Sequence, residues 1–323
     1  NKGTLQDDIF AVEFLEKDGQ KFGFDAYQDN KFPIKNHYQE YKTQSENPYL
    51  DPWKSLQTDK NDKVNAKVEI KDNNRSADDI RFRYADGTKI EKTNSGNKEF
   101  TLSLNKSNTP GEEEIISYFV AKDNENRDIE QQVAYLKQVT YDKDLTNLHL
   151  VPVGNVNISD AQLQLVSDIK TIYRQAAIDI NVNIMDRLPD FTWDVNGTKG
   201  LDCGNTLNLS NYTTEQKGII RKFEELTNKG EDDYVIFIID GQAEDRKSGI
   251  MPRGRRYGFV FSPSATTIAH ELGHGAFRLQ HTFPDIAKGA TDNLMDYGGG
   301  KQLWKYQWDL VHDPKTIIPW FQG

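Results

Sequence analysis

The sequence predicts a multidomain protein in which an all-β sandwich is followed by a domain of α/β (α+β) class. Three observations predict this architecture. The chain has 323 residues, enough for about two domains at roughly 150 residues each. From about residue 61 to 143 the apolar residues alternate with a period of two, which is typical of half-buried strands. After Tyr141 strand-like and helix-like segments alternate instead, so we divide the chain into residues 1–60, 61–143 and 144–323.

Composition argues against two broad functions. Lys and Arg number 40 against 50 Asp and Glu, which gives a formal net charge of −10 and an isoelectric point near 5.2. Nucleic-acid binding depends on clustered basic charge, and no stretch has the ~18 consecutive apolar residues of a membrane helix. We therefore expect no nucleic-acid partner and no membrane span.

Cysteine content and the first residues bear on the compartment. The one cysteine, Cys203, cannot form an intrachain disulfide or a cysteine-rich zinc site, and we expect it to be an ordinary packed side chain. Residues 1–8 contain no initiator Met, no basic region and no apolar region. We interpret the chain as a mature form or a fragment from which a targeting segment has been removed.

Residues 1–60 form an aromatic-rich segment interrupted by turn signals. Asp18-Gly19, Asn47-Pro48 and Asp51-Pro52 are dipeptides that favour turns. Between them we expect short strands and ordered loops. The segment is interpreted as a lead-in that packs against a neighbouring domain.

Residues 61–143 contain the clearest strand pattern. Val64, Ala66, Val68 and Ile70 alternate with polar residues, and similar runs recur at 80–84, 100–104, 115–121 and 131–139. Asp-Gly, Ser-Gly and Pro-Gly pairs separate the runs. Six or seven short strands with this spacing predict an immunoglobulin-like β-sandwich.

Residues 144–323 alternate between the two kinds of element. Strands are expected at 148–153, 180–184, 234–239 and 258–261. The first helix is expected to follow a capping pair, Ser159 and Gln162, and the second to follow Thr213 and Gln216 and to end at Lys229-Gly230. A further helix is expected over 303–311. This order predicts the α/β (α+β) domain.

Three of the six histidines lie within twelve residues, between His270 and His281. In a helix His270 and His274 lie on one face, so both imidazoles can bind one metal ion with Glu271 beside it. This H-E-x-x-H pattern arises by chance on the order of once in a hundred chains of this length. Ile268, Leu272, Ala276 and Leu279 would form the opposite, apolar face of that helix. The segment therefore predicts a zinc site.

A catalytic zinc site needs a third protein ligand. In an unbroken helix His281 would lie about 16 Å along the axis from His270, so the helix must end soon after His274. Gly275 is a plausible place for the backbone to loosen. Three candidates for the third ligand remain open at this point: His281, Asp292 and Asp296.

The segment His270–His281, followed by Thr282-Phe283 and by Asn293-Leu294-Met295-Asp296-Tyr297, resembles the signature of the metzincin clan of zinc metallopeptidases. It is most similar to the pappalysin and cytophagalysin type. The chain departs from the clan in one respect. The clan has Gly at the seventh residue after the first His and its third His at the tenth, whereas here Phe277 stands at the seventh and His281 comes at the eleventh.

The resemblance implies a metzincin-like zinc metallopeptidase domain and a role for each matched residue. It implies one catalytic Zn²⁺ held by His270, His274 and His281. Glu271 would be the general base, Met295 the methionine of the turn beneath the metal, and Tyr297 a fifth ligand or a donor to the transition state. Without the resemblance, Met295 would be an ordinary core residue and Tyr297 a packed aromatic.

A compact basic run precedes the last strand before the zinc helix. It contains Arg253, Arg255 and Arg256 in an otherwise acidic protein. In metzincins the strand nearest the helix is an edge strand along which an extended substrate can pair. We hypothesise that these arginines favour acidic groups of a substrate or prosegment; the alternative is a solvated loop.

The sequence therefore predicts a zinc-dependent endopeptidase, a hydrolase of polypeptide substrates. By resemblance to domains of secreted proteins of Bacteroidota, we expect secretion or delivery outside the producing cell, an effector or toxin role, a monomer, and an immunity or inhibitor protein as a candidate partner. Two alternatives remain. One is an adhesin or binding module whose zinc site is structural or inactive, and the other is a zinc hydrolase of peptidoglycan peptides.

Overall fold

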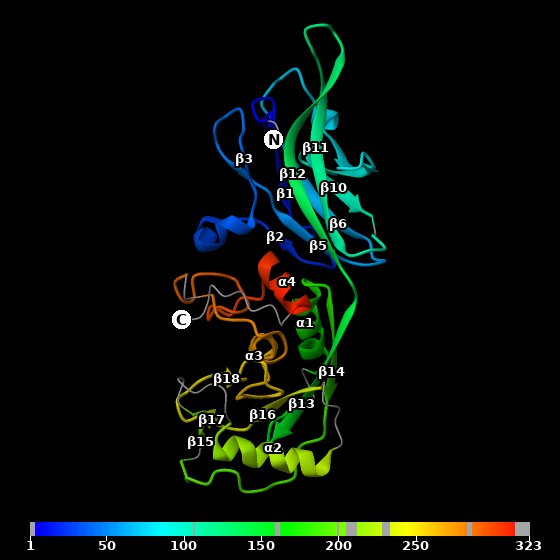
Figure 1. Ribbon diagram of the computed structural model, residues 1–323. Helices are drawn as coiled ribbons and strands as arrows, with labels where there is room; N and C mark the ends of the chain where they lie inside the picture. The colour runs from blue at the N-terminus through cyan, green and yellow to red at the C-terminus, as the bar shows by residue number, and fades with distance from the viewer. Residues whose placement is uncertain are drawn as a thin grey trace. The chain divides into compact units, whose positions relative to one another are not determined.

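A computed structural model describes residues 4–105, 107–158, 162–198, 200–204, 212–227, 233–282 and 286–313. The protein is a mixed α/β chain that divides into two compact units (Figure 1). The first unit comprises Asn1–Lys143 with Gln175–Ala177, and the second comprises Asp144–Arg174 with Ile178–Gly323. Ser159 and Lys229-Gly230, expected to cap two helices, lie outside the described residues.

The first unit is built from β-strands, with two 3-10 helices, Asp29–His37 and Ala77–Asp79, among its described residues. A four-stranded sheet has the order β1 (Phe10–Leu15), β6 (Asp62–Ile70), β10 (Glu99–Leu104), β9 (Lys92–Gly96). A six-stranded sheet has the order β2 (Phe24–Asp25), β5 (Trp53–Gln57), β12 (Asp128–Tyr141), β11 (Gly111–Lys122), β7 (Arg81–Tyr84), β8 (Lys89–Ile90). A short ribbon joins β3 (Glu40–Tyr41) and β4 (Tyr49–Leu50).

The two large sheets share one hydrophobic core. Phe10 packs edge-on against Phe119 at 5.2 Å between ring centroids, and Phe14 packs against Phe82 at 6.2 Å. These pairs join β1 of one sheet to β11 and β7 of the other. Strands β1 and β5 come from the aromatic-rich first 60 residues and pair with β6 and β12, so that segment supplies strands to both sheets. The immunoglobulin-like topology stays a prediction.

The second unit has a five-stranded sheet covered by helices. Its order is β14 (Ile178–Ile184), β13 (Asp144–Val153), β16 (Tyr234–Ile239), β19 (Tyr257–Val260), β18 (Gly249–Ile250). Neighbouring strands are parallel except β18, which runs antiparallel to β19 and forms one edge of the sheet. A separate ribbon joins β15 (Gly200–Leu201) and β17 (Gln242–Ala243).

Helices lie on both faces of this sheet (Figure 1). On one face α1 (Gln162–Arg174) packs against α3 (Ala265–Phe277), and on the other α2 (Thr214–Leu226) packs its Phe223 against Phe237 of β16. The expected Thr213–Gln216 capping box starts α2. The last helix of the described residues, α4 (Lys305–His312), buries Trp308 and Val311. No helix in the described ranges is long and apolar enough to span a membrane.

Candidate metal centre

The imidazole Nε2 atoms of His270, His274 and His281 converge on one point. The distance is 3.2 Å between His270 and His274 and 3.1 Å from each of them to His281. Tetrahedral zinc with nitrogen ligands at 2.0–2.1 Å places such atoms about 3.3 Å apart. Among the described residues these three form the one group of at least three potential ligands able to hold an ion. The donor set and its spacing therefore fit zinc.

Backbone carbonyls fix the direction of two of the rings. His270 Nδ1 donates to Leu294 O and His274 Nδ1 donates to Leu279 O, each at 2.7 Å. Because a carbonyl can only accept, we assign the ring proton to Nδ1 in both residues, which leaves the Nε2 lone pairs facing the centre. Acceptor atoms turned toward one another at this distance form a site suited to a cation.

Burial also keeps these rings neutral. It is the largest cause of the lowered pKa of all three histidines; the pKa of His281 falls to about 4 and that of His274 lies well below its usual value. A neutral imidazole is the form that binds a metal ion.

The end of α3 explains how His281 reaches the other two. The helix runs three residues past His274 to Phe277, and Arg278 then adopts the left-handed conformation with φ 55°. Leu279 N donates to Gly273 O, so the chain folds back over the last turn. In the clan that the segment resembles, a glycine stands three residues before the third His; here Arg278 has that place.

The expectation that the backbone loosens at Gly275 is wrong, because Gly275 stays helical. A Cβ at this position would overlap the Sδ and Cε atoms of Met251 and lie 2.8 Å from Arg255 O. The glycine is needed for this close approach of the loop before β19. Leu279, expected on the apolar face of the helix, is buried but lies beyond the helix end.

The two aspartates weighed as third ligands lie elsewhere. Asp296 accepts hydrogen bonds from Gly289 N, Tyr297 N, and both Thr291 N and Oγ1. Burial raises the pKa of this carboxyl, but these bonds outweigh it and the pKa is lowered. Asp292 is exposed. Neither belongs to the group that His270, His274 and His281 form.

Glu271 follows the first ligand on α3 and is 5% exposed. Its carboxylate accepts a hydrogen bond from Met251 N, and it fills the space beside Gly249 of β18, where a Cβ would lie 2.8 Å from Oε1. Burial raises the pKa of Glu271 to about 8, although the Met251 N–H and the Lys247 charge act in the opposite direction. A carboxyl held in this way can take up a proton near neutral pH.

Met295 packs against the helix that carries two of the histidines. It is fully buried, and a Cβ on Gly273 would lie 2.9 Å from its Sδ, so the methionine lies against α3 next to the turn between His270 and His274. Asn293 and Gln307 exchange side-chain hydrogen bonds of 2.7 and 3.0 Å, which join the loop that contains Met295 to α4. The position suits the methionine turn that the resemblance implies.

Tyr297 stands beside the histidines. Its ring centroid lies 4.9 Å from that of His281 and 5.8 Å from that of His270, and the residue is 52% exposed. Lys288 Nζ lies 4.1 Å from the centre of the same ring. Burial is the largest cause of its raised pKa, followed by the charge of Glu271, so the phenol keeps its proton.

The three arginines of the basic run separate. Arg253 lies beside the centre, because the adjacent Gly254 N donates to His274 O and the Arg253 charge contributes to the lowered pKa of that ring. Arg256 turns away and donates to Asp233 O. Arg255 is exposed, and its charge acts on Tyr212. Sequence reasoning missed Lys247, Gly249, Met251 and Lys288, and no spacing from the histidines indicates them.

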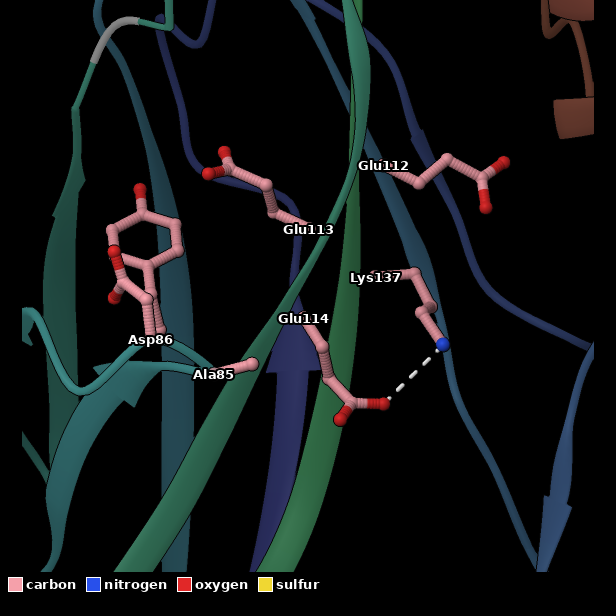
Figure 2. A pocket seen from close by; sticks show the side chains of 7 residues that line it. Ala85, Asp86, Glu112, Glu113, Glu114 and Lys137 are labelled. Carbon is pink, nitrogen blue, oxygen red and sulfur yellow. Dashed lines mark ion pairs between the residues drawn. The ribbon is translucent and has the colours of Figure 1, made fainter.

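The first unit contains a pocket of about 420 Å³ that carries none of this chemistry. Figure 2 shows its lining of acidic side chains with Lys137. Glu114 pairs with Lys137 at 3.3 Å, and Glu113 accepts from Gln138 Nε2 at 3.0 Å. Both contacts join β11 to β12, so Glu113 and Glu114 stabilise the sheet, and we assign the pocket no function.

No family model matches the chain, and no curated protein matches its sequence. Among solved structures it is similar to an archaemetzincin from Methanopyrus kandleri, with 15% identity over 53% of this chain and 96% of that chain and a TM-score of 0.34. It is also similar to Dex49A from Penicillium minioluteum, with 8% identity, 60% and 32% coverage and a TM-score of 0.20.

Proposed function

We propose that the second unit is a zinc-dependent endopeptidase in which His270, His274 and His281 hold the metal and Glu271 is the general base. One observation carries the proposal. Three Nε2 atoms lie 3.1–3.2 Å apart, and a buried carboxyl follows directly after the first of these histidines on the same helix. Three protein ligands beside a carboxyl are typical of catalytic zinc sites.

Each residue of the site would have its own role in amide hydrolysis. Zinc bound here would acidify water and polarise a scissile carbonyl. Glu271, oriented by Met251 N, would take a proton from the attacking water and pass it to the leaving nitrogen. Tyr297, protonated and next to His281, would donate to the developing oxyanion. The edge strand β18, against which Glu271 lies, offers a place for an extended peptide to pair.

A structural zinc site in a binding module is the main alternative. In such sites four protein ligands complete the coordination of the metal, and no general base is needed. Here the Glu271 carboxyl is buried and held by a backbone N–H, an arrangement that stabilises a proton acceptor and does not strengthen a metal site. A hydrolase of peptidoglycan peptides would use the same residues, so the substrate has to be tested directly.

The test combines metal content with cleavage. The chain, Glu271→Gln and the control Glu225→Gln would each be loaded with zinc, analysed by metal mass spectrometry, and incubated with denatured protein or with peptidoglycan peptides. Glu225 is exposed on α2, across the sheet from the histidines. We expect about one zinc per chain in all three, and cleavage reduced about 10²–10⁴-fold in Glu271→Gln alone. Zinc binding without any cleavage by the unmodified chain would refute the enzyme.

Secretion, an effector role, a monomeric state and an inhibitor or immunity partner are finer parts of this proposal. They rest on the resemblance of the zinc motif. Size-exclusion chromatography with light scattering would test the monomer, and capture of an inhibitor by the zinc-loaded Glu271→Gln chain would test the partner.

A further inference from the structure

Cationic residues from three separate loops lie near the histidine centre. Lys247 precedes β18, Arg253 lies between β18 and β19, and Lys288 lies between His281 and Met295. The chain as a whole has a net charge of −10. Three cationic residues near one site therefore differ from the acidic average of the chain.

Backbone contacts fix the first two loops against α3. Lys247 is two residues before Gly249, whose Cα lies against the Glu271 carboxyl. Arg253 stands between Met251, whose N–H bonds Glu271, and Gly254, whose N–H bonds His274 O at 3.1 Å. Both side chains therefore start from backbone that touches the base or a ligand.

Lys288 is positioned by Tyr297. Its ammonium lies 4.1 Å from the centre of the Tyr297 ring, and that ring lies 4.9 Å from the ring of His281. The Lys288 and Arg253 charges both act on the His281 ring, and the Lys247 charge acts on Glu271. Charges from three separate loops therefore act on the histidine group or on Glu271 beside it.

Acidic groups also lie near these cations, among them Glu271, Asp245 and Asp296. Asp245 pairs with Lys247 at 2.7 Å, and the Asp296 carboxylate accepts four hydrogen bonds from its own loop. Lys247 Nζ is buried and acts on a peptide only through its field, whereas Arg253 and Lys288 are exposed, so we expect Arg253 and Lys288 to have the larger effects.

Resting on the proposed function, we propose that Lys247, Arg253 and Lys288 select peptides that carry carboxylates close to the scissile bond. Each cation attracts an anionic group, and attraction at a rim raises the association rate and disfavours basic peptides. The carboxylate can come from an Asp or Glu side chain or from a peptide C-terminus. Of the three arginines in the basic run, Arg253 takes part in this selection.

The test uses matched peptides and the zinc-loaded chain. One set is amidated and carries Glu, Gln or Lys on either side of the cleaved bond, and a second set has neutral side chains and a free C-terminus. Cleavage rates would be compared for the unmodified chain, for Lys247→Gln, Arg253→Gln and Lys288→Gln singly and combined, and for Arg221→Gln. Arg221 is exposed on α2, on the other face of the sheet, and undergoes the same change of charge.

Binding supplies a second readout that does not depend on turnover. Fluorescence anisotropy would measure how tightly the labelled Glu and Gln peptides bind the Glu271→Gln chain with and without zinc, at low and at high salt. We expect the Glu peptide to bind and to be cleaved better, with about threefold loss for single variants and about tenfold for the combined one. High salt should weaken the preference.

The outcomes separate the two proposals. Equal cleavage of Glu and Gln peptides, or a loss in Arg221→Gln as large as in the combined variant, overturns the selection and leaves the peptidase standing. Salt-sensitive binding of Glu peptides without any cleavage supports the selection and refutes the peptidase. A preference confined to the second set of peptides would identify the C-terminal carboxylate as the recognised group.

Discussion

Gly275→Ala should destabilise the second unit, although alanine is the better helix former. The residue lies in the last turn of α3, where its missing side chain makes room for Met251. Gly218, in the middle of α2, provides a matched control, because a Cβ there would have nothing within 4 Å. The same substitution in two helices is expected to have opposite effects.

The magnitude follows from the contacts that the new methyl group would make. It would overlap the Met251 thioether and lie 2.8 Å from Arg255 O, and Met251 is itself 3% exposed and packed on Gly258. Overpacking a core costs about 1–3 kcal/mol, and because the methyl would meet a buried side chain and a backbone oxygen together we take the upper part, about 2–3 kcal/mol. The helix propensity of alanine over glycine returns about 1 kcal/mol. The expected net loss is about 1–2 kcal/mol for Gly275→Ala, against a gain of about 1 kcal/mol for Gly218→Ala.

Thermal unfolding of the metal-free chain would measure both effects, followed by the fluorescence of buried tryptophans such as Trp304 and Trp308. At about 2–4 °C per kcal/mol for a unit of this size, the Gly275→Ala transition should fall by several degrees while the Gly218→Ala transition rises. Met251→Ala in the Gly275→Ala background should recover part of the loss. A Gly275→Ala chain that melts at or above the unmodified chain would refute the close-approach argument.

Three further predictions concern the turn, the ligands and the phenol. Arg278→Gly should raise stability by up to about 1 kcal/mol and Arg278→Val should lower it by about 1–2 kcal/mol in thermal melts, because φ is 55° there. Without metal, the melting temperature should fall as the pH drops below 6.5. The pKa values of the buried histidines are lowered, that of His281 to about 4, so the unfolded chain binds more protons than the folded chain in this window. His281→Asn should make the melting temperature depend less on pH. Tyr297→Phe should lower kcat about 10–100-fold in steady-state assays and leave KM and zinc content unchanged.

Each of these three predictions would be contradicted by a specific result. Equal stability of Arg278→Gly and Arg278→Val would mean that backbone strain at this turn is negligible. A melting temperature of the metal-free chain that is constant between pH 6.5 and 4 would contradict the neutral, buried histidines. Full kcat in Tyr297→Phe would leave Tyr297 a packed aromatic, the alternative that the sequence also allows.

Local patterns predicted those parts of the protein that depend on neighbours a few residues apart. The period of two over residues 61–143 and the alternation after Tyr141 indicated the mixed α/β chain. The Thr213–Gln216 pair indicated the start of α2. Helical spacing placed His270 and His274 on one face, because residues four apart lie one turn from each other in any α-helix.

The third ligand could not be chosen by the same means. His281, Asp292 and Asp296 were all within reach along the sequence, and the choice depends on where α3 ends and what the next loop binds. The helix ends at Arg278, while Gly289, Thr291 and Tyr297 donate hydrogen bonds to Asp296. These contacts form when segments close in three dimensions.

The sequence by itself determined the elements, the helix that carries the metal motif and the chemistry of its side chains. Tertiary structure decided which residues complete the centre: His281 as the third histidine, Met251 as the residue that holds Glu271, and Lys247, Arg253 and Lys288 around it. The physical reason is the separation along the chain over which each interaction acts. Propensity and periodicity act over one or two turns of backbone, whereas burial, ligand convergence and charge act between segments that meet only when the chain has folded.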